Sequence, residues 1–169
     1  AYATNDAGTA YGEEISFTTS EAMVLEFNTS LGDNEIVLPL HGEVDVVVDW
    51  GDGDINSINN KGNYSHTYEN EGKYKVTISG TLTKFISDWG YKGNKKLIHV
   101  HDFGDLGLTS LAGAFIEANN LESVPEELPA TVTDLSRTFY WINRESITNL
   151  SKWDVSNVKD MSSMFYDAE

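Results

Sequence analysis

Side chains able to hold a metal ion are concentrated in one short segment of the sequence. Asp52, Asp54 and Asn56 place oxygen atoms at every second position, as in the first half of a calcium-binding loop. The second half of that loop does not follow, because Ser57 stands where the loop needs glycine and Asn63 where it needs a bidentate glutamate. We therefore expect a tight turn whose side chains hydrogen-bond their own backbone, with calcium binding as the alternative and no other cofactor.

Histidine offers a second kind of chemistry, proton transfer or ligand recognition. His99 and His101 flank Val100, and if Val100 points into a core, its two neighbours point outwards from the strand. His66 is expected to support a strand or turn by hydrogen bonds. The sequence contains no Gly-x-Ser-x-Gly, His-Glu-x-x-His or Gly-x-x-x-x-Gly-Lys motif. We predict that the chain is not an enzyme.

The element that carries His99 and His101 is part of a repeat. Phe115, Phe139 and Phe165 are spaced 24 and 26 residues apart, and the positions 4, 7, 15 and 18 residues before each of them are all apolar. A period of this length indicates a solenoid, in which each unit buries its apolar face against its neighbours. The three units, residues 97–115, 121–139 and 147–165, contain these apolar positions: Leu97, Val100, Leu108, Leu111, Phe115; Leu121, Val124, Val132, Leu135, Phe139; Ile147, Leu150, Val158, Met161, Phe165.

Each unit is expected to combine a short strand with a short helix. The helices would begin after Ser110, Asp134 and Asp160, whose side chains are typical N-caps. In the strands, the positions equivalent to the two histidines form a polar stripe on the outer face, where leucine-rich repeats usually bind ligands. We predict a ligand-binding surface there, with a merely solvated face as the alternative, made of His99, His101, Ser123, Asn149 and Ser151.

Aromatic residues outside the repeat frame are a second candidate surface. Tyr140 and Trp141 could stack on sugar rings, or they could close the seam between units. Trp89 and Tyr91 are expected to close the junction between the repeat region and the preceding segment.

Residues 20–90 show strand patterns without helical periodicity. Val44, Val46, Val48 and Trp50 share one face of an alternating segment, and turn-forming residues separate this segment from the next. Short alternating strands in so small a segment predict an antiparallel β-sandwich. Residues 1–19 read as a hairpin with its turn at residues 5–8 and a second strand that includes Ile15, Phe17 and Thr19.

Three segments resemble known families. The polycystic-kidney-disease (PKD) type domain, an immunoglobulin-like module of bacterial extracellular proteins, resembles three pieces of this sequence: Trp50-Gly51-Asp52-Gly53, His66-Thr67-Tyr68 and Gly72-Lys73-Tyr74-Lys75-Val76-Thr77-Ile78. Residues 1–19 resemble the closing hairpin of a fibronectin type III-like domain. Residues 150–165 resemble the BspA-like leucine-rich repeat of about 26 residues found in bacterial surface proteins. These resemblances imply spacing, adhesion or carbohydrate-associated roles at the cell surface or outside the cell.

The charge balance restricts the partners of this chain. It has 11 Lys and Arg against 27 Asp and Glu, a net charge of −16, and no cysteine. Such a chain is repelled by phosphate backbones and anionic lipids, which disfavours nucleic-acid and membrane-surface binding, and no apolar run is long enough to span a membrane. The absence of cysteine excludes disulfides and Cys-ligated zinc.

Together these features predict a mainly β fragment of a longer surface or secreted protein. The expected parts are a hairpin over 1–19, an immunoglobulin-like sandwich over 20–90 and a short leucine-rich-repeat-like α/β solenoid over 91–169. The expected function is non-catalytic binding of a protein or glycan, with a structural stalk as the alternative and a domain of an extracellular carbohydrate-active enzyme as the third choice. The outer face of the third unit is expected to be apolar and exposed, so that further repeats of the chain or a second copy would cover it.

Overall fold

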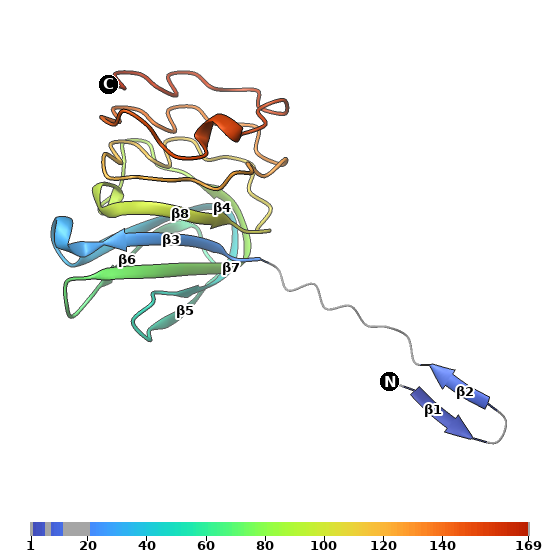
Figure 1. The fold of residues 1–169 in the computed structure, drawn as a ribbon. Helices are drawn as coiled ribbons and strands as arrows, with labels where there is room; N and C mark the ends of the chain where they lie inside the picture. Colours follow the sequence, from blue (N-terminus) through green and yellow to red (C-terminus); the bar gives the residue numbers. More distant parts are fainter. Residues whose placement is uncertain (1, 6–7, 12–20, 169) are drawn as a thin grey trace.

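A computed structural model describes residues 2–5, 8–11 and 21–168 (Figure 1). Within these residues the chain is mainly β, with no α-helix and with three short 3-10 segments. The expectation of a mainly β chain is therefore confirmed, whereas the short helix expected in each repeat unit is not found in the described part. The same part of the chain contains no helix long and apolar enough to cross a membrane.

The elements are labelled in chain order, with strands as β and 3-10 segments as η. They are β1 (Tyr2–Asn5), β2 (Gly8–Tyr11), β3 (Met23–Asn28), η1 (Thr29–Leu31), β4 (Glu35–Asp49), β5 (Ile55–Ile58), β6 (Gly62–Thr67), β7 (Lys73–Phe85), η2 (Asn94–Lys96), β8 (Leu97–Phe103) and η3 (Leu150–Lys152).

Six of the strands form one antiparallel sheet. Its main path runs β5-β4-β7-β3-β8, and β6 pairs with the first part of β4. β4 pairs with β6 along residues 35–40 and with β5 along residues 46–49. Between these two stretches its register with β7 shifts, from His41 to Val44, where Gly42 has a φ of 73°. A β-carbon on this glycine would lie 2.2 Å from the hydroxyl oxygen of Thr83, so the bend requires glycine. The strands expected over 20–90 are thus present, and they lie in a single sheet that β8 extends beyond residue 90.

The alternation seen in the sequence sets which face of the sheet is buried. Val44, Val46, Val48 and Trp50 are at most 9% exposed, while Asp45 and Asp49, which alternate with them, are exposed. Burial of one face in this way removes apolar surface from water and fixes the register of the strand, because a slip by one residue would bring the acidic side chains into the core.

The predicted N-terminal hairpin is partly confirmed. β1 and β2 pair antiparallel, with Tyr2 opposite Tyr11 and Asn5 opposite Gly8, so the connection falls within the predicted turn. The second strand is β2, which begins at Gly8, the last residue of the predicted turn. Ile15, Phe17 and Thr19, which were expected in this strand, lie outside the described residues.

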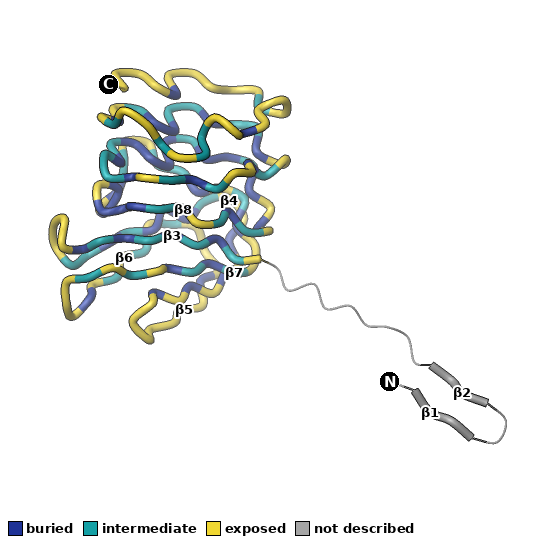
Figure 2. The backbone as a smooth tube through the Cα atoms, in the orientation of Figure 1, coloured by how far each residue is buried: buried dark blue, intermediate teal, exposed yellow. Residues whose placement is uncertain are grey.

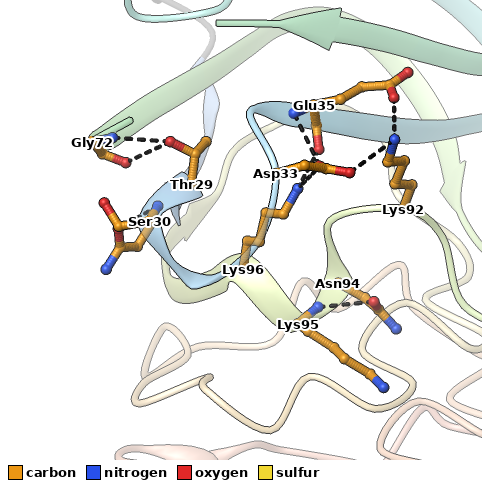
Figure 3. A network of polar contacts seen from close by, with 10 residues as sticks. Thr29, Ser30, Asp33, Glu35, Gly72, Lys92, Asn94, Lys95 and Lys96 are labelled. Atoms are coloured by element: carbon orange, nitrogen blue, oxygen red, sulfur yellow. Dashed lines mark hydrogen bonds and ion pairs between the residues drawn. The ribbon is translucent and has the colours of Figure 1, made fainter. Parts of the chain in front are cut away.

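A polar network ties η2 to the loop before β4 (Figure 3). The ammonium group of Lys96, whose side chain is only 7% exposed, pairs with the Asp33 carboxylate and donates a hydrogen bond to the carbonyl of Glu35 at 2.6 Å. Lys92 pairs with the same Asp33 at 3.0 Å and with the Glu35 carboxylate. Hydrogen bonds from Lys96 and Lys92 hold the pKa of Asp33 well below its ordinary value. The network fixes the start of β8, because η2 leads directly into that strand.

The chain after β8 is folded into turns stacked on the sheet (Figure 1). Two columns of parallel bridges run along the stack. One joins Lys84 near the end of β7 to Ser110, Asp134 and Asp160 in succession. The other joins His99 in β8 successively to Ser123 and Thr148. β7 and β8 are therefore the base on which the repeat units stack.

Each unit contains a tight, non-helical segment where a helix was expected. We call these segments the first turn (110–118), the second turn (134–142) and the terminal turn (160–168). In each of them the amides of three alternate residues donate to the carbonyl three residues earlier, as Ala114 donates to Leu111 at 3.0 Å. Left-handed residues four apart interrupt any helix: Gly113 and Glu117, then Arg137 and Trp141, then Ser163 and Asp167.

The predicted caps act on these turns. The Ser110 hydroxyl accepts a hydrogen bond from the amide of Ala112 at 3.2 Å, and the Asp134 and Asp160 carboxylates accept from the amides two residues on at 2.9 and 2.8 Å. The prediction that these three residues act as caps is thus confirmed. They cap a turn and not a helix, because the left-handed residue that follows does not allow a helix to propagate.

The fifteen apolar frame positions separate into two groups by burial (Figure 2). All ten positions of the first two units are at most 1% exposed and belong to one apolar core shared with the sheet. In the third unit, Met161 is 48% and Phe165 is 52% exposed. The terminal turn is mostly exposed in Figure 2, at the end of the stack away from the sheet.

Candidate functional site

The predicted polar stripe borders an open groove on the side of the stack. The groove has a volume of about 760 Å³ and runs along β8, the loop after it and residues 123–131. Three stripe residues line it, namely His101, Ser123 and Asn149. The other two stripe residues, His99 and Ser151, do not line the groove. The structure therefore brings part of the predicted surface together in a concave site.

His101 is held in place from the neighbouring strand. Its Nε2 lies 2.7 Å from the Glu26 Oε2 on β3. Burial opposes ionisation of Glu26, but the hydrogen bond and the charge of His101 outweigh it and lower the pKa of this carboxyl. The pair positions an imidazole at the groove edge, where it can exchange hydrogen bonds with a ligand.

The other stripe residues have roles within the stack. His99 Nδ1 lies 2.9 Å from the Ser123 hydroxyl, which ties β8 to the second unit. Asn149, in the left-handed conformation with a φ of 72°, donates from its side chain to the carbonyl of Val124 at 3.1 Å. Ser151 lies exposed in η3. The stripe thus contributes hydrogen bonds between units as well as a polar surface.

The groove has a strongly acidic lining. It includes no lysine or arginine, and its only buried aromatic side chain, Phe103, belongs to the core. Glu126 pairs with Lys152 at the rim. The frame-based prediction missed these carboxylates because none of them occupies a frame position or a stripe position. The acidic residues that line the groove are Glu21, Asp102, Asp105, Glu126 and Glu127.

The two aromatic candidates lie elsewhere, in the second turn. Tyr140 stacks on Tyr166 with ring centroids 4.9 Å apart and planes 10° from parallel, and Trp141 donates its indole N–H to Asp167 at 3.3 Å. Both interactions join the second turn to the terminal turn. The structure therefore places Tyr140 and Trp141 at a seam between units and outside the groove lining.

The expected junction residues behave differently from each other. Tyr91 is 9% exposed and packs edge-on against Phe85 at 5.9 Å, as expected for a junction residue. Burial raises the pKa of its hydroxyl. Trp89 is 76% exposed, so the prediction that it closes the junction is wrong. The Arg137 guanidinium lies 5.8 Å from its ring, an exposed cation–π contact.

The predicted calcium ligands are only partly brought together. The Asn56 side-chain oxygen accepts the indole N–H of Trp50 at 2.7 Å and is engaged in that contact. In its place His66 approaches the loop from β6, with Nε2 2.7 Å from the Asp52 carboxylate and its ring stacked on Trp50 at 4.7 Å. Asp52, Asp54 and His66 offer ligand atoms within 4.8 Å of one another.

The Asp52 carboxylate also serves the turn itself. Its second oxygen accepts the Asp54 amide at 3.1 Å, so the expected turn with self-capping side chains is present. Burial opposes ionisation of Asp52, but the hydrogen bonds from His66 and from the Asp54 amide lower its pKa. The expectation that His66 supports a turn by hydrogen bonds is confirmed.

Comparison with known proteins finds one family that is similar to part of this chain. Residues 108–169 match a family described as a Mycoplasma protein of unknown function, DUF285. The match begins two residues before the first turn and covers all three turns, but not the six-stranded sheet. No curated protein and no solved structure matched the chain.

Proposed function

We propose that the chain is a non-catalytic binding or adhesion module of a cell-surface or secreted protein. In this proposal the sheet is a PKD-like, immunoglobulin-type sandwich that serves as a spacer. The stacked turns form a short leucine-rich-repeat-like solenoid of the BspA type, and this solenoid is the recognition part. The N-terminal hairpin is the end of a fibronectin-like domain.

Two features support this division of roles. The bridged residues in the two columns are spaced 24 to 26 residues apart, close to the spacing of the apolar frame, which is the construction of a solenoid. In the sheet, β4 bends at Gly42 and carries different partners on its two halves, which is compatible with a sandwich whose layers share one strand.

The observation that carries the functional proposal is the groove of about 760 Å³ beside β8, lined by His101, Ser123 and Asn149. A concave surface with several polar groups from successive units is the usual form of a ligand site on a solenoid. Its partner is a protein or a glycan that offers hydrogen-bond donors and positive charge to the acidic lining.

The test is a binding screen of the full chain against arrays of glycans and of purified host proteins. A groove variant, His101→Ala with Glu127→Ala, should lose at least about tenfold in affinity for any ligand found, since it removes polar partners from the site. The matched control, Glu43→Ala with Glu71→Ala, removes exposed carboxylates outside the groove lining and should bind as the parent does. A ligand whose affinity is unchanged by the groove variant would contradict the assignment.

A structural stalk is the competing function. It predicts no ligand on either array and a rigid end-to-end arrangement of the modules in solution. Small-angle scattering on a longer piece of the protein would detect that rigidity. A rigid arrangement together with no ligand on either array would favour the stalk.

A further inference from the structure

The turns are joined to one another by hydrogen bonds that all run in one direction. Alternate amides of the first turn donate to carbonyls of the second, and alternate amides of the second donate to the terminal turn. The N–O distances are 2.8–3.0 Å throughout. The donor–acceptor pairs are Leu111–Asp134, Gly113–Ser136, Phe115–Thr138 and Glu117–Tyr140, then Leu135–Asp160, Arg137–Ser162, Phe139–Met164 and Trp141–Tyr166.

This pattern gives every turn two different faces. The carbonyls of the donating residues are used inside the turn, as Leu111 accepts from Ala114 and Phe115 from Ala118. One face therefore presents a row of amide donors and the other a row of carbonyl acceptors. An ordinary strand edge differs, because it alternates donors and acceptors along its length.

The terminal turn exposes its donor face. In the described part of the chain, no hydrogen bond is made by the amides of Met161, Ser163, Phe165 and Asp167, which are equivalent to the four donors of each inner turn. Beside them lie the exposed side chains of Met161 and Phe165, whose counterparts in both inner turns are fully buried. A surface of unpaired backbone donors and exposed apolar side chains is stabilised when another segment packs on it, because the donors find acceptors and apolar area is removed from water.

A second copy of the chain cannot cover this surface with either end of its own stack. Its acceptor face is already used, because Ser110 and Ala112 accept from Phe85 at 3.2 Å and Ser87 at 3.0 Å. Its terminal turn would bring donors against donors. The occupant must present four carbonyls in a row with apolar side chains between them, and a turn with the same left-handed positions does so.

We propose that the terminal turn is the docking surface for one further repeat unit of the same build. The interface with this added unit would repeat the two interfaces already present between the three turns. It would have the same hydrogen-bond direction, the same spacing and the same apolar contacts. Two terminal faces lack the acceptors needed to pair with each other. A small anion could accept from the four amides, but it would leave Phe165 exposed and meet a net charge of −16.

The experiment adds a unit to the full chain. A second copy of residues 144–169 is fused directly after Glu169, which keeps the 26-residue spacing of the last two frame phenylalanines. Amide hydrogen exchange of Met161, Ser163, Phe165 and Asp167 should slow by at least about tenfold, because each amide gains an acceptor in the added turn. The melting temperature should rise.

The control is a fused unit of equal length in which the four positions copied from Leu150, Val158, Met161 and Phe165 are serine. This added segment cannot bury an apolar face and should leave exchange at the four amides unchanged. Equal exchange in the two fusions would overturn the proposal. Two results with the parent chain would also overturn it. Protection of the same amides that increases with protein concentration would indicate self-association, and protection that increases with added phosphate would indicate anion binding.

Discussion

The inner turns and the terminal turn have the same apolar frame but different surroundings. Phe115 and Phe139 are fully buried, whereas Phe165 is 52% exposed although its ring is stacked on Phe139 at 5.5 Å. The amides of the inner turns are paired to the next turn, and those of the terminal turn are not. The difference shows that the frame encodes the shape of a unit, while the neighbour supplies much of its stability.

The largest expected effect comes from truncating an aromatic ring in each environment. Phe139→Ala should lower the free energy of unfolding by about 3–5 kcal/mol, because it opens a cavity between the rings of Phe115, Trp153 and Phe165. Phe165→Ala should cost at most about 1.5 kcal/mol, mainly the stacking contact with Phe139. Urea denaturation of the two variants measures both values, and equal costs would show that the terminal turn is as well covered as the inner ones.

A smaller effect is expected from the backbone of the first turn. Gly113 has a φ of 63°, and a β-carbon there would lie 2.0 Å from the carbonyl oxygen of Ser87. Gly113→Ala should therefore cost at least about 2 kcal/mol, since it adds a backbone clash to the left-handed strain. The same denaturation experiment measures it.

The matched control for that change is Gly107→Ala. Gly107 is also left-handed, with a φ of 80°, but has no atom within 4 Å of its would-be β-carbon. It should show the conformational strain alone. Arg137 and Ser163 occupy the position equivalent to Gly113 at φ values of 54° and 53°, so only the turn against β7 requires glycine. Equal losses in the two glycine variants would remove the close approach to Ser87 from the explanation.

The smallest expected effect is a pH dependence of the third unit. Hydrogen bonds from the backbone and side chain of Ser156 lower the pKa of Asp154, and those of Ser162 lower the pKa of Asp160. A carboxyl whose pKa is lower in the folded state stabilises that state above its ordinary pKa and loses the contribution as the pH falls through the folded value. The third unit should fray first below about pH 4.

Limited proteolysis by pepsin across pH 2–5 measures this fraying at the terminal turn. Asp160→Asn keeps an oxygen acceptor for the Ser162 amide but does not titrate, so its cleavage should depend less on pH than that of the parent. An unchanged pH profile in Asp160→Asn would assign the fraying to other groups.

The burial of the inner units could be predicted from the sequence, because a fixed apolar period depends only on residue type and spacing. The apolar period did not predict that each unit contains a tight turn in place of a helix. Glu117, Arg137 and Trp141 take left-handed conformations that their side chains do not favour, and the equivalent residues of the terminal turn, Ser163 and Asp167, do the same. Helical spacing of apolar residues therefore predicted a helix at these positions.

The candidate site was predicted in part for similar reasons. His101, Ser123 and Asn149 follow from the frame, since equivalent outward positions in stacked units lie near each other. The acidic residues of the groove, such as Glu126 and Glu127, lie in loops with no period. The pairing of His66 with Asp52 was also invisible, because it joins β6 to a turn fourteen residues earlier.

Residue-resolved amide hydrogen exchange of the unmodified chain tests the comparison between the turns most directly. We expect slow exchange at Leu135, Arg137, Phe139 and Trp141, whose amides donate to the terminal turn. Exchange should be at least about a hundredfold faster at Met161, Ser163, Phe165 and Asp167, which are exposed and whose amides make no hydrogen bond in the described part of the chain. Similar protection of the two sets in dilute protein would contradict the claim that the terminal turn presents an open donor face.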